Sequence, residues 1–165
     1  SGAFDKNYSV DEAIQNFNNR ERDILDLAEY FREHKPKSHE VWFSGNAKEF
    51  DISIVLPRWA VMEKFPKKHA MNLKLNTPEA DSLLSTIGWT NKTVSDLAER
   101  LKKSNCMNIS SDEEVVTVHY RTGTWTSFSY VVFDKPITDS LKKVYDEAKV
   151  RMLRDNVKLA TSHAL

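Results

Sequence analysis

The strongest structural signal in the sequence is a long amphipathic helix predicted over residues 9–34. Ser9 and Glu12 form the pattern of a capping box, in which the serine oxygen accepts from the Glu12 amide and the glutamate reaches back. Apolar residues then recur every three or four positions, which places them on one side of a helix, and Pro36 ends the pattern. The apolar positions are Val10, Ile14, Phe17, Ile24, Ala28 and Phe31, with Leu25 and Leu27 beside them.

Much of the remaining chain has the alternating or β-branched pattern of strands. Strands are predicted over residues 41–43, 50–56, 71–75, 115–120 and 125–133, with a terminal hairpin over 150–160. Further helices are predicted over residues 77–88, 92–104 and 138–149. The patterns therefore predict one α+β domain over residues 1–165, with a mainly antiparallel sheet packed against several helices.

Two short sequences recur in the same order and suggest an internal repeat. Asp-Leu-Ala-Glu occurs at residues 26–29 and again at 96–99, and the segment 78–83 resembles the segment 136–141. Both halves then read as helix, strands and helix. We predict a tandem α-β-β-β-α duplication over residues 9–88 and 90–149, followed by the terminal hairpin. The alternative is coincidence, because residues that favour helices make short matches common.

Composition excludes several classes of protein. The 165 residues contain 24 basic and 24 acidic side chains, so nucleic-acid binding through bulk charge is not expected. One cysteine, Cys106, rules out a disulfide framework. No apolar run approaches the roughly 18 residues of a transmembrane helix, so no transmembrane segment is predicted in this chain. The chain begins Ser1-Gly2 without methionine, so a signal peptide could already have been removed.

Motifs with a defined chemistry are absent. The four glycines are not spaced for a dinucleotide or phosphate loop, and no nucleophile elbow occurs. The histidines lack the spacing of a zinc site, so we predict neither a metal nor a cofactor. Cys106 follows a predicted helix and is interpreted as a small buried apolar residue rather than as a nucleophile.

The first candidate binding set lies around the turn between residues 120 and 125. His119, Tyr120 and Arg121 lead through this turn to Trp125. Tryptophan, tyrosine and arginine are enriched at binding hot spots. We predict that Arg121 and Trp125 share a rim beside the turn; the alternative is that Trp125 belongs to the core.

The second candidate set is a segment where basic and aromatic residues alternate. Such a segment can bind single-stranded nucleic acid by charge and stacking, or it can be a solvated loop with buried aromatics. Its members are Trp59, Lys64, Lys67, Lys68 and His69.

The last third of the chain resembles small uncharacterised bacterial proteins that are often exported or lipid-anchored. The resemblance is carried by residues 128–139, by Asn105-Cys106 and by His119-Tyr120-Arg121. It implies an envelope or other extracytoplasmic location and assigns no activity to any residue.

Three functions are compatible with the sequence. The first is a non-catalytic binding or interaction module whose partner is another protein or a small ligand. The second is a hydrolase whose active site is assembled from dispersed residues, which a perturbed titratable pair in a cleft would support. The third is an immunity-type protein that neutralises a toxin, which a strongly acidic groove would support.

Overall fold

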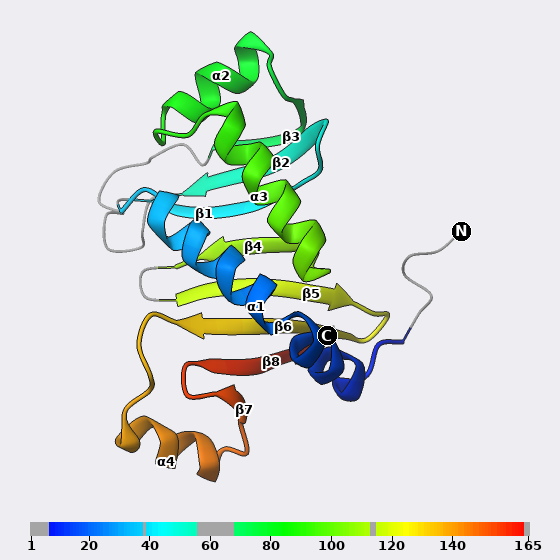
Figure 1. Cartoon of the computed structure of the whole chain (residues 1–165), viewed down its shortest axis with the longest axis vertical. Coiled ribbons are helices and arrows are strands. Elements are labelled where there is room, and N and C mark those ends of the chain that lie inside the picture. Colours follow the sequence, from blue (N-terminus) through cyan, green and yellow to red (C-terminus); the bar gives the residue numbers. More distant parts are fainter. Residues whose placement is uncertain (1–6, 38, 56–67, 113–114, 164–165) are drawn as a thin grey trace.

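The computed structural model describes residues 7–37, 39–55, 68–112 and 115–163, and in this part of the chain it contains four helices and one eight-stranded sheet (Figure 1). The helices are α1 (Val10–His34), α2 (Pro78–Ser85), α3 (Asn91–Ser104) and α4 (Asp139–Glu147). The strands are β1 (Glu40–Gly45), β2 (Glu49–Val55), β3 (Lys68–Lys74), β4 (Asn108–Ser111), β5 (Val115–Thr122), β6 (Thr126–Phe133), β7 (Arg151–Arg154) and β8 (Val157–His163). The strand order is β3-β2-β1-β4-β5-β6-β8-β7, and each neighbouring pair is antiparallel. The predicted α+β class is therefore confirmed.

Helix α1 begins where the sequence predicts and bends once. The capping box is present, with the Ser9 hydroxyl accepting from the Glu12 amide and the Glu12 carboxylate accepting from the Ser9 amide. Arg20 has non-helical backbone angles, and the weak helix formers Asn18 and Asn19 precede it. Figure 1 shows the change of direction, which brings both parts of the helix against the sheet.

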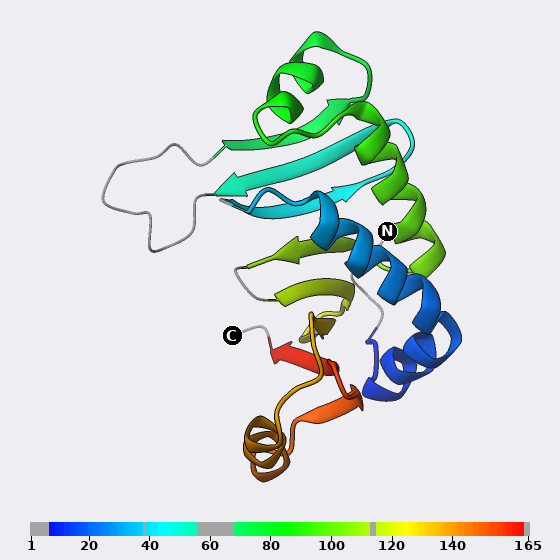
Figure 2. The same ribbon diagram turned by 60° about the vertical axis from the view of Figure 1, so that its left-hand side comes forward.

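One face of the sheet is covered by α1 and α3, which lie against each other (Figure 2). Alternate strand residues point toward these helices and are buried, as the period of two requires. The largest fully buried side chains include Phe17, Phe31, Phe43, Phe50, Phe128 and Tyr130. The apolar core therefore lies between the two helices and a single face of the sheet.

Both outer strands of the sheet have features that discourage further pairing. β3 carries Lys68 and Lys74 and is interrupted at Asn72, whose φ of 54° is left-handed. β7 has only four residues, and it begins and ends with arginine. Charged side chains, bulges and short length are the usual protection of an edge strand.

The order of elements is the same in the two predicted repeats. α1-β1-β2-β3-α2 is followed by α3-β4-β5-β6-α4, and the sheet order β3-β2-β1-β4-β5-β6 runs outward from the central β1–β4 pair in both directions. Different strand orders in the two halves would argue against a duplication, and the sheet does not have them. The β7–β8 hairpin extends only the second half.

Contacts between α1 and α3 are reciprocal at the recurring Asp-Leu-Ala-Glu sequence. The Tyr30 hydroxyl donates to Asp96 at 3.1 Å, and Arg100 lies 3.0 Å from Asp26. In each pair the aspartate of one repeat contacts the residue four positions after the aspartate of the other. The Arg100 guanidinium also lies 4.0 Å from the centre of the Tyr30 ring. Reciprocal contacts are typical of two-fold related elements, so a duplication remains our proposal for these halves.

Two parts of the fold differ from what the sequence suggests. The short strand β4, with the sequence Asn-Ile-Ser-Ser, is not predicted, because a single apolar residue gives no periodicity. The periodicity of residues 138–149 also predicts that Leu141, Val144, Tyr145 and Ala148 point inward. None of them is buried: Leu141 and Tyr145 are half-buried, Ala148 is exposed, and Val144 is 55% exposed. Helical periodicity identifies an apolar side but not whether another element covers it.

A buried polar network ties the N-terminal part of α1 to the sheet. The Tyr130 hydroxyl donates to the Ala13 carbonyl at 2.8 Å and accepts from the Asn16 amide at 3.1 Å. Asn16 also donates to the Ser104 carbonyl and accepts from Asn105, at the end of α3. Burial raises the pKa of Tyr130, so its hydroxyl keeps the donated proton. These bonds satisfy polar groups that would otherwise be buried without partners.

We expect Tyr130→Phe to lower the free energy of unfolding by about 1–3 kcal/mol, because it leaves the Ala13 carbonyl and the Asn16 amide without this partner. Urea denaturation measures the change, and each kcal/mol corresponds to a fall in Tm of about 2–4 °C. Tyr145→Phe is the matched control, since among the described residues the hydroxyl of the half-buried Tyr145 has a single long contact, 3.4 Å from the Lys158 Nζ. Equal midpoints for the two variants would contradict the role of the network.

Candidate functional site

The second face of the sheet has a polar centre built from four strands. We call it the open face, because in the described part of the chain α1 and α3 cover the opposite side (Figure 2). Cross-strand register places Trp42 opposite Ser110, Ser110 opposite Thr117, and His119 opposite both Asn108 and Ser129. These half-buried residues alternate with the buried ones. The centre of the open face consists of Trp42, Asn108, Ser110, Thr117, His119 and Ser129.

His119 is held in place by hydroxyl groups at both ring nitrogens. Its Nδ1 lies 2.8 Å from the Ser129 hydroxyl, and its Nε2 lies 2.8 Å from the Thr122 hydroxyl. Burial lowers the pKa of His119, and the positive charge of Arg121 lowers it further. The imidazole is therefore neutral at pH 7, with one nitrogen donating and the other accepting.

Trp42 lies beside this histidine cluster and is fixed by its indole nitrogen. The Trp42 Nε1 donates to the Asn108 side-chain oxygen at 3.2 Å. Two residues further along β1, on the same face, the Ser44 hydroxyl donates to the Met107 carbonyl at 3.0 Å. An aromatic ring held among small polar groups can bind by apolar contact and by hydrogen bonding together.

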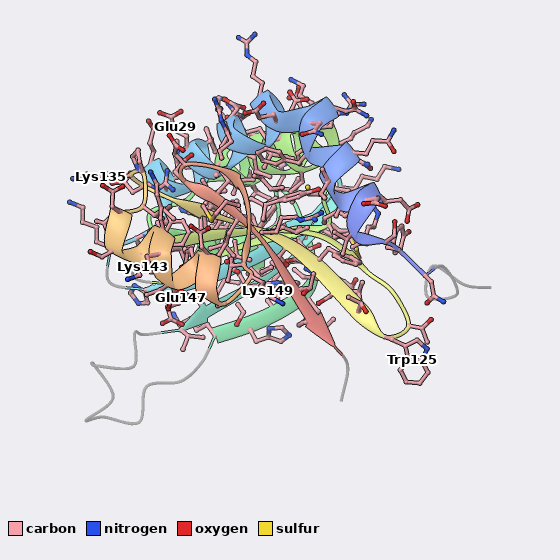
Figure 3. All side chains as sticks on the ribbon, turned by 90° about the horizontal axis from the view of Figure 1, so that it is seen from below. Glu29, Trp125, Lys135, Lys143, Glu147 and Lys149 are labelled. Atoms are coloured by element: carbon pink, nitrogen blue, oxygen red, sulfur yellow. The ribbon has the colours of Figure 1, made fainter. Side chains whose placement is uncertain are left out.

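The four residues of the first predicted binding set lie in four different environments. His119 faces the open face, whereas Tyr120 is buried in the core between sheet and helices. A register shift between His119 and Arg121 breaks the alternation, and Arg121 reaches the end of α3, where it donates to the carbonyl and side chain of Asn105. Trp125 is 67% exposed at the tip of the β5–β6 hairpin, from which it projects in Figure 3.

The second predicted set is only partly described. Trp59, Lys64 and Lys67 lie outside the described residues. Lys68 and His69 are exposed on β3, where His69 lies opposite Ser53 of β2. These two side chains are therefore at the edge of the sheet, four strands away from His119.

Cys106 lies apart from the open face, and its thiol is protected. It is half-buried against the helix side of the core, where its sulfur contacts the Ser104 carbonyl at 3.4 Å. Burial raises the pKa of Cys106 to about 11, so the thiol is protonated at pH 7. This environment agrees with the interpretation of Cys106 as a small apolar residue.

The centre of the open face is broad rather than concave. None of its six residues lines any of the five main cavities of the described structure. Within residues 7–163, leaving out the gaps given above, no three metal-ligating side chains gather to hold an ion. No helix in the described part is long and apolar enough to cross a membrane.

Comparison with known proteins gives no relative: no family model, no curated protein and no solved structure matches the chain. The open face must therefore be interpreted from its own geometry.

Sequence reasoning finds His119 but misses Trp42, Asn108 and Ser129. Nothing in a linear sequence brings residues 42, 108 and 129 together, because their proximity depends on the register of four strands. The alternation of serine with aromatic residues over 127–130 is a signal, but it is typical of any strand with one solvent-facing side.

We expect the free energy of unfolding to fall as the pH drops below about 6.5, the ordinary histidine pKa, because the unfolded chain then binds a proton that folded His119 resists. The fall should end once the pH passes below the folded pKa. His119→Gln should remove this part of the pH dependence and cost about 1–2 kcal/mol at pH 7.5 through the lost hydrogen bonds.

Urea denaturation at pH 5–7.5 measures both effects. His69→Gln is the control, since His69 is exposed on β3 and lies away from the Ser129 and Thr122 hydroxyls. A wild-type pH profile in the His119→Gln protein would show that His119 does not resist protonation.

Proposed function

We propose that this protein is a non-catalytic interaction module that binds a partner protein across the open face. The observation that carries the proposal is the exposed side of the eight-stranded sheet, where Trp42 and the His119 cluster are held in fixed positions. Preformed side chains lose little conformational freedom on binding, which favours affinity.

The dimensions of the face suit a macromolecule. Tyr145 of α4 lies over Phe133 of β6 and Lys158 of β8, so the uncovered part runs from β3 to β6. Its five spacings of about 4.8 Å give a width of roughly 24 Å, and strands of about six residues give a length of roughly 20 Å. The resulting area of roughly 480 Å² per partner corresponds to a small interface of less than about 1,200 Å² in total. None of the six central residues lines one of the five main cavities of the described structure, which favours a flat partner surface over a small ligand.

The charge at the centre of the open face limits the kind of partner. At pH 7 the six central residues carry no formal charge, because His119 is neutral. Recognition would therefore depend on shape, the indole ring and hydrogen bonds to hydroxyl and amide groups, rather than on long-range attraction. This argues against nucleic acid as the partner of this face.

A hydrolase is the second candidate, and one contact favours it. Ser129 and His119 lie within hydrogen-bonding distance, as a nucleophile and its base must. However, the other imidazole nitrogen meets the Thr122 hydroxyl, where a Ser-His-Asp triad has a carboxylate. The pair therefore lacks the group that would orient and stabilise a charged imidazole.

An immunity-type function finds less support in the described cavities. The one with most carboxylates has Glu21, Asp26 and Glu29, but Arg22 and Arg154 line it as well. Arg154 forms an ion pair with Glu21 at 2.6 Å. The groove is therefore mixed in charge rather than strongly acidic.

Site-directed photo-crosslinking tests the proposed interaction. A benzophenone side chain at Ser110, in the centre of the open face, should give a discrete adduct with one protein in cells that naturally make this chain. The same group at Lys102, exposed on α3, should not. Thr117→Arg should abolish the Ser110 adduct because it places a long charged side chain in the contact, whereas Lys102→Glu should leave the adduct unchanged.

Adducts of equal yield from both positions, or an adduct that survives Thr117→Arg, would contradict binding at the open face. Hydrolysis of p-nitrophenyl esters by the wild type, lost in Ser129→Ala, would instead favour the hydrolase.

A further inference from the structure

A groove lies at the end of the sheet where β5 begins and β6 ends, away from the six central residues of the open face. Its volume is about 490 Å³, within the range of small-molecule sites. Its apolar wall includes Val115 and Phe133 from the strands, Ile137 from the following loop and Leu141 from α4. Arg32 on α1 and Lys35, the residue after its end, also border the groove. The groove is therefore formed by segments from both halves of the sequence.

The packing of α4 beside this groove is incomplete. α4 buries none of its residues, and Leu141 remains only half-buried although it faces the groove. The rest of the helix is held by Tyr145, whose ring lies 6.5 Å from that of Phe133. An apolar body in the groove would remove further surface of the half-buried Leu141 and Phe133 from water, which is favourable.

The rim of the groove is positively charged. Among the described lining residues, Arg32, Lys35 and Lys135 supply three cations and Asp134 supplies one carboxylate. Arg32 is positioned by a 3.2 Å bond to the Val132 carbonyl and lies 3.6 Å from Asp134.

The contacts of Arg32 and Lys35 balance only part of the positive charge at the rim. The carboxylate of Asp134 is 62% exposed, so solvent weakens its pairing with Arg32. Among the described residues, Lys35 donates to a backbone carbonyl, that of Asp112 at 3.2 Å. Within the described residues that line the groove, three cations face one carboxylate, so an anion at the rim would meet positive charge that Asp134 alone does not balance.

We propose that this groove binds a small amphiphilic carboxylate, with its apolar body against Phe133, Ile137 and Leu141 and its carboxylate at Arg32, Lys35 and Lys135. An apolar wall with a few charged groups at one side is the usual construction of a site for such a ligand. A medium-chain carboxylate matches both parts.

Octanoate is the probe for this site. Titration followed by ¹H–¹⁵N NMR should shift the amides of residues 115, 133, 137 and 141 and saturate with a Kd near the millimolar range, as expected for about ten non-hydrogen atoms. Octan-1-ol, which keeps the chain and lacks the charge, should bind more weakly. Acetate, which keeps the charge and lacks the chain, should cause no saturable shift.

Two double variants with the same loss of charge isolate the rim. Lys35→Gln with Lys135→Gln should weaken octanoate about tenfold. Lys102→Gln with Lys143→Gln should keep the wild-type Kd, since these exposed lysines do not line the groove; Figure 3 labels Lys135 before α4 and Lys143 on it. Dispersed spectra of both variants would show that they fold.

Equal affinities in the two double variants, or shifts spread over the surface without saturation, would overturn the proposal. So would tighter binding of octan-1-ol than of octanoate, because the cations would then play no part. A failed octanoate titration would not contradict the proposed interaction at the open face, since none of the six central residues lines this groove.

Discussion

The pairing of β1 with β4 is the contact on which the rest of the architecture depends. It joins strands from the two halves of the sequence, through the pairs Val41–Ser111, Trp42–Ser110 and Phe43–Ile109. Without it the sheet would divide into β1–β3 and β4–β8, and α1 and α3 would have no common surface to cover. The same short junction places Trp42 beside Asn108, so the core and the open face both follow from one pair of strands.

The two faces of the sheet differ in how far their hydrogen-bonded polar side chains are buried. On the helix side, Asn16 and Tyr130 are buried and hydrogen-bonded, and they tie the N-terminal part of α1 to the sheet and to the end of α3. On the open face, His119 and Trp42 are also hydrogen-bonded, yet they remain half-buried and accessible. Side chains that are already ordered favour binding, because little conformational entropy is lost when a partner contacts them.

The sequence predicts those elements whose signal is local. α1 follows from periodicity and its cap, and β2 follows from the alternation of Phe50, Ile52 and Ile54. β4 is not predicted, because it is a strand through its pairing with β1 and β5 and not through its own composition. α4 is found but its exposure is not, because burial depends on what lies opposite.

Prediction of the site is limited in the same way. His119, Tyr120 and Arg121 are neighbours in sequence, but alternation and a register shift send them to different sides of the sheet. Conversely, His119 and Ser129 meet only because β5 and β6 pair in one register. A cluster in sequence is thus a weak guide to a cluster on a sheet, whereas a cross-strand row is a strong one.

The reach of α1 across the molecule has a consequence for synthesis of the chain. α1 packs on α3, β5 and β6, so the partners of a helix that ends at residue 34 extend to residue 133. During translation, about a hundred residues after the end of α1 must be synthesised before the strands and the helix that cover its apolar side are all present. The first half therefore leaves the ribosome with an uncovered helix, and the chain depends on late closure of the sheet to bury it.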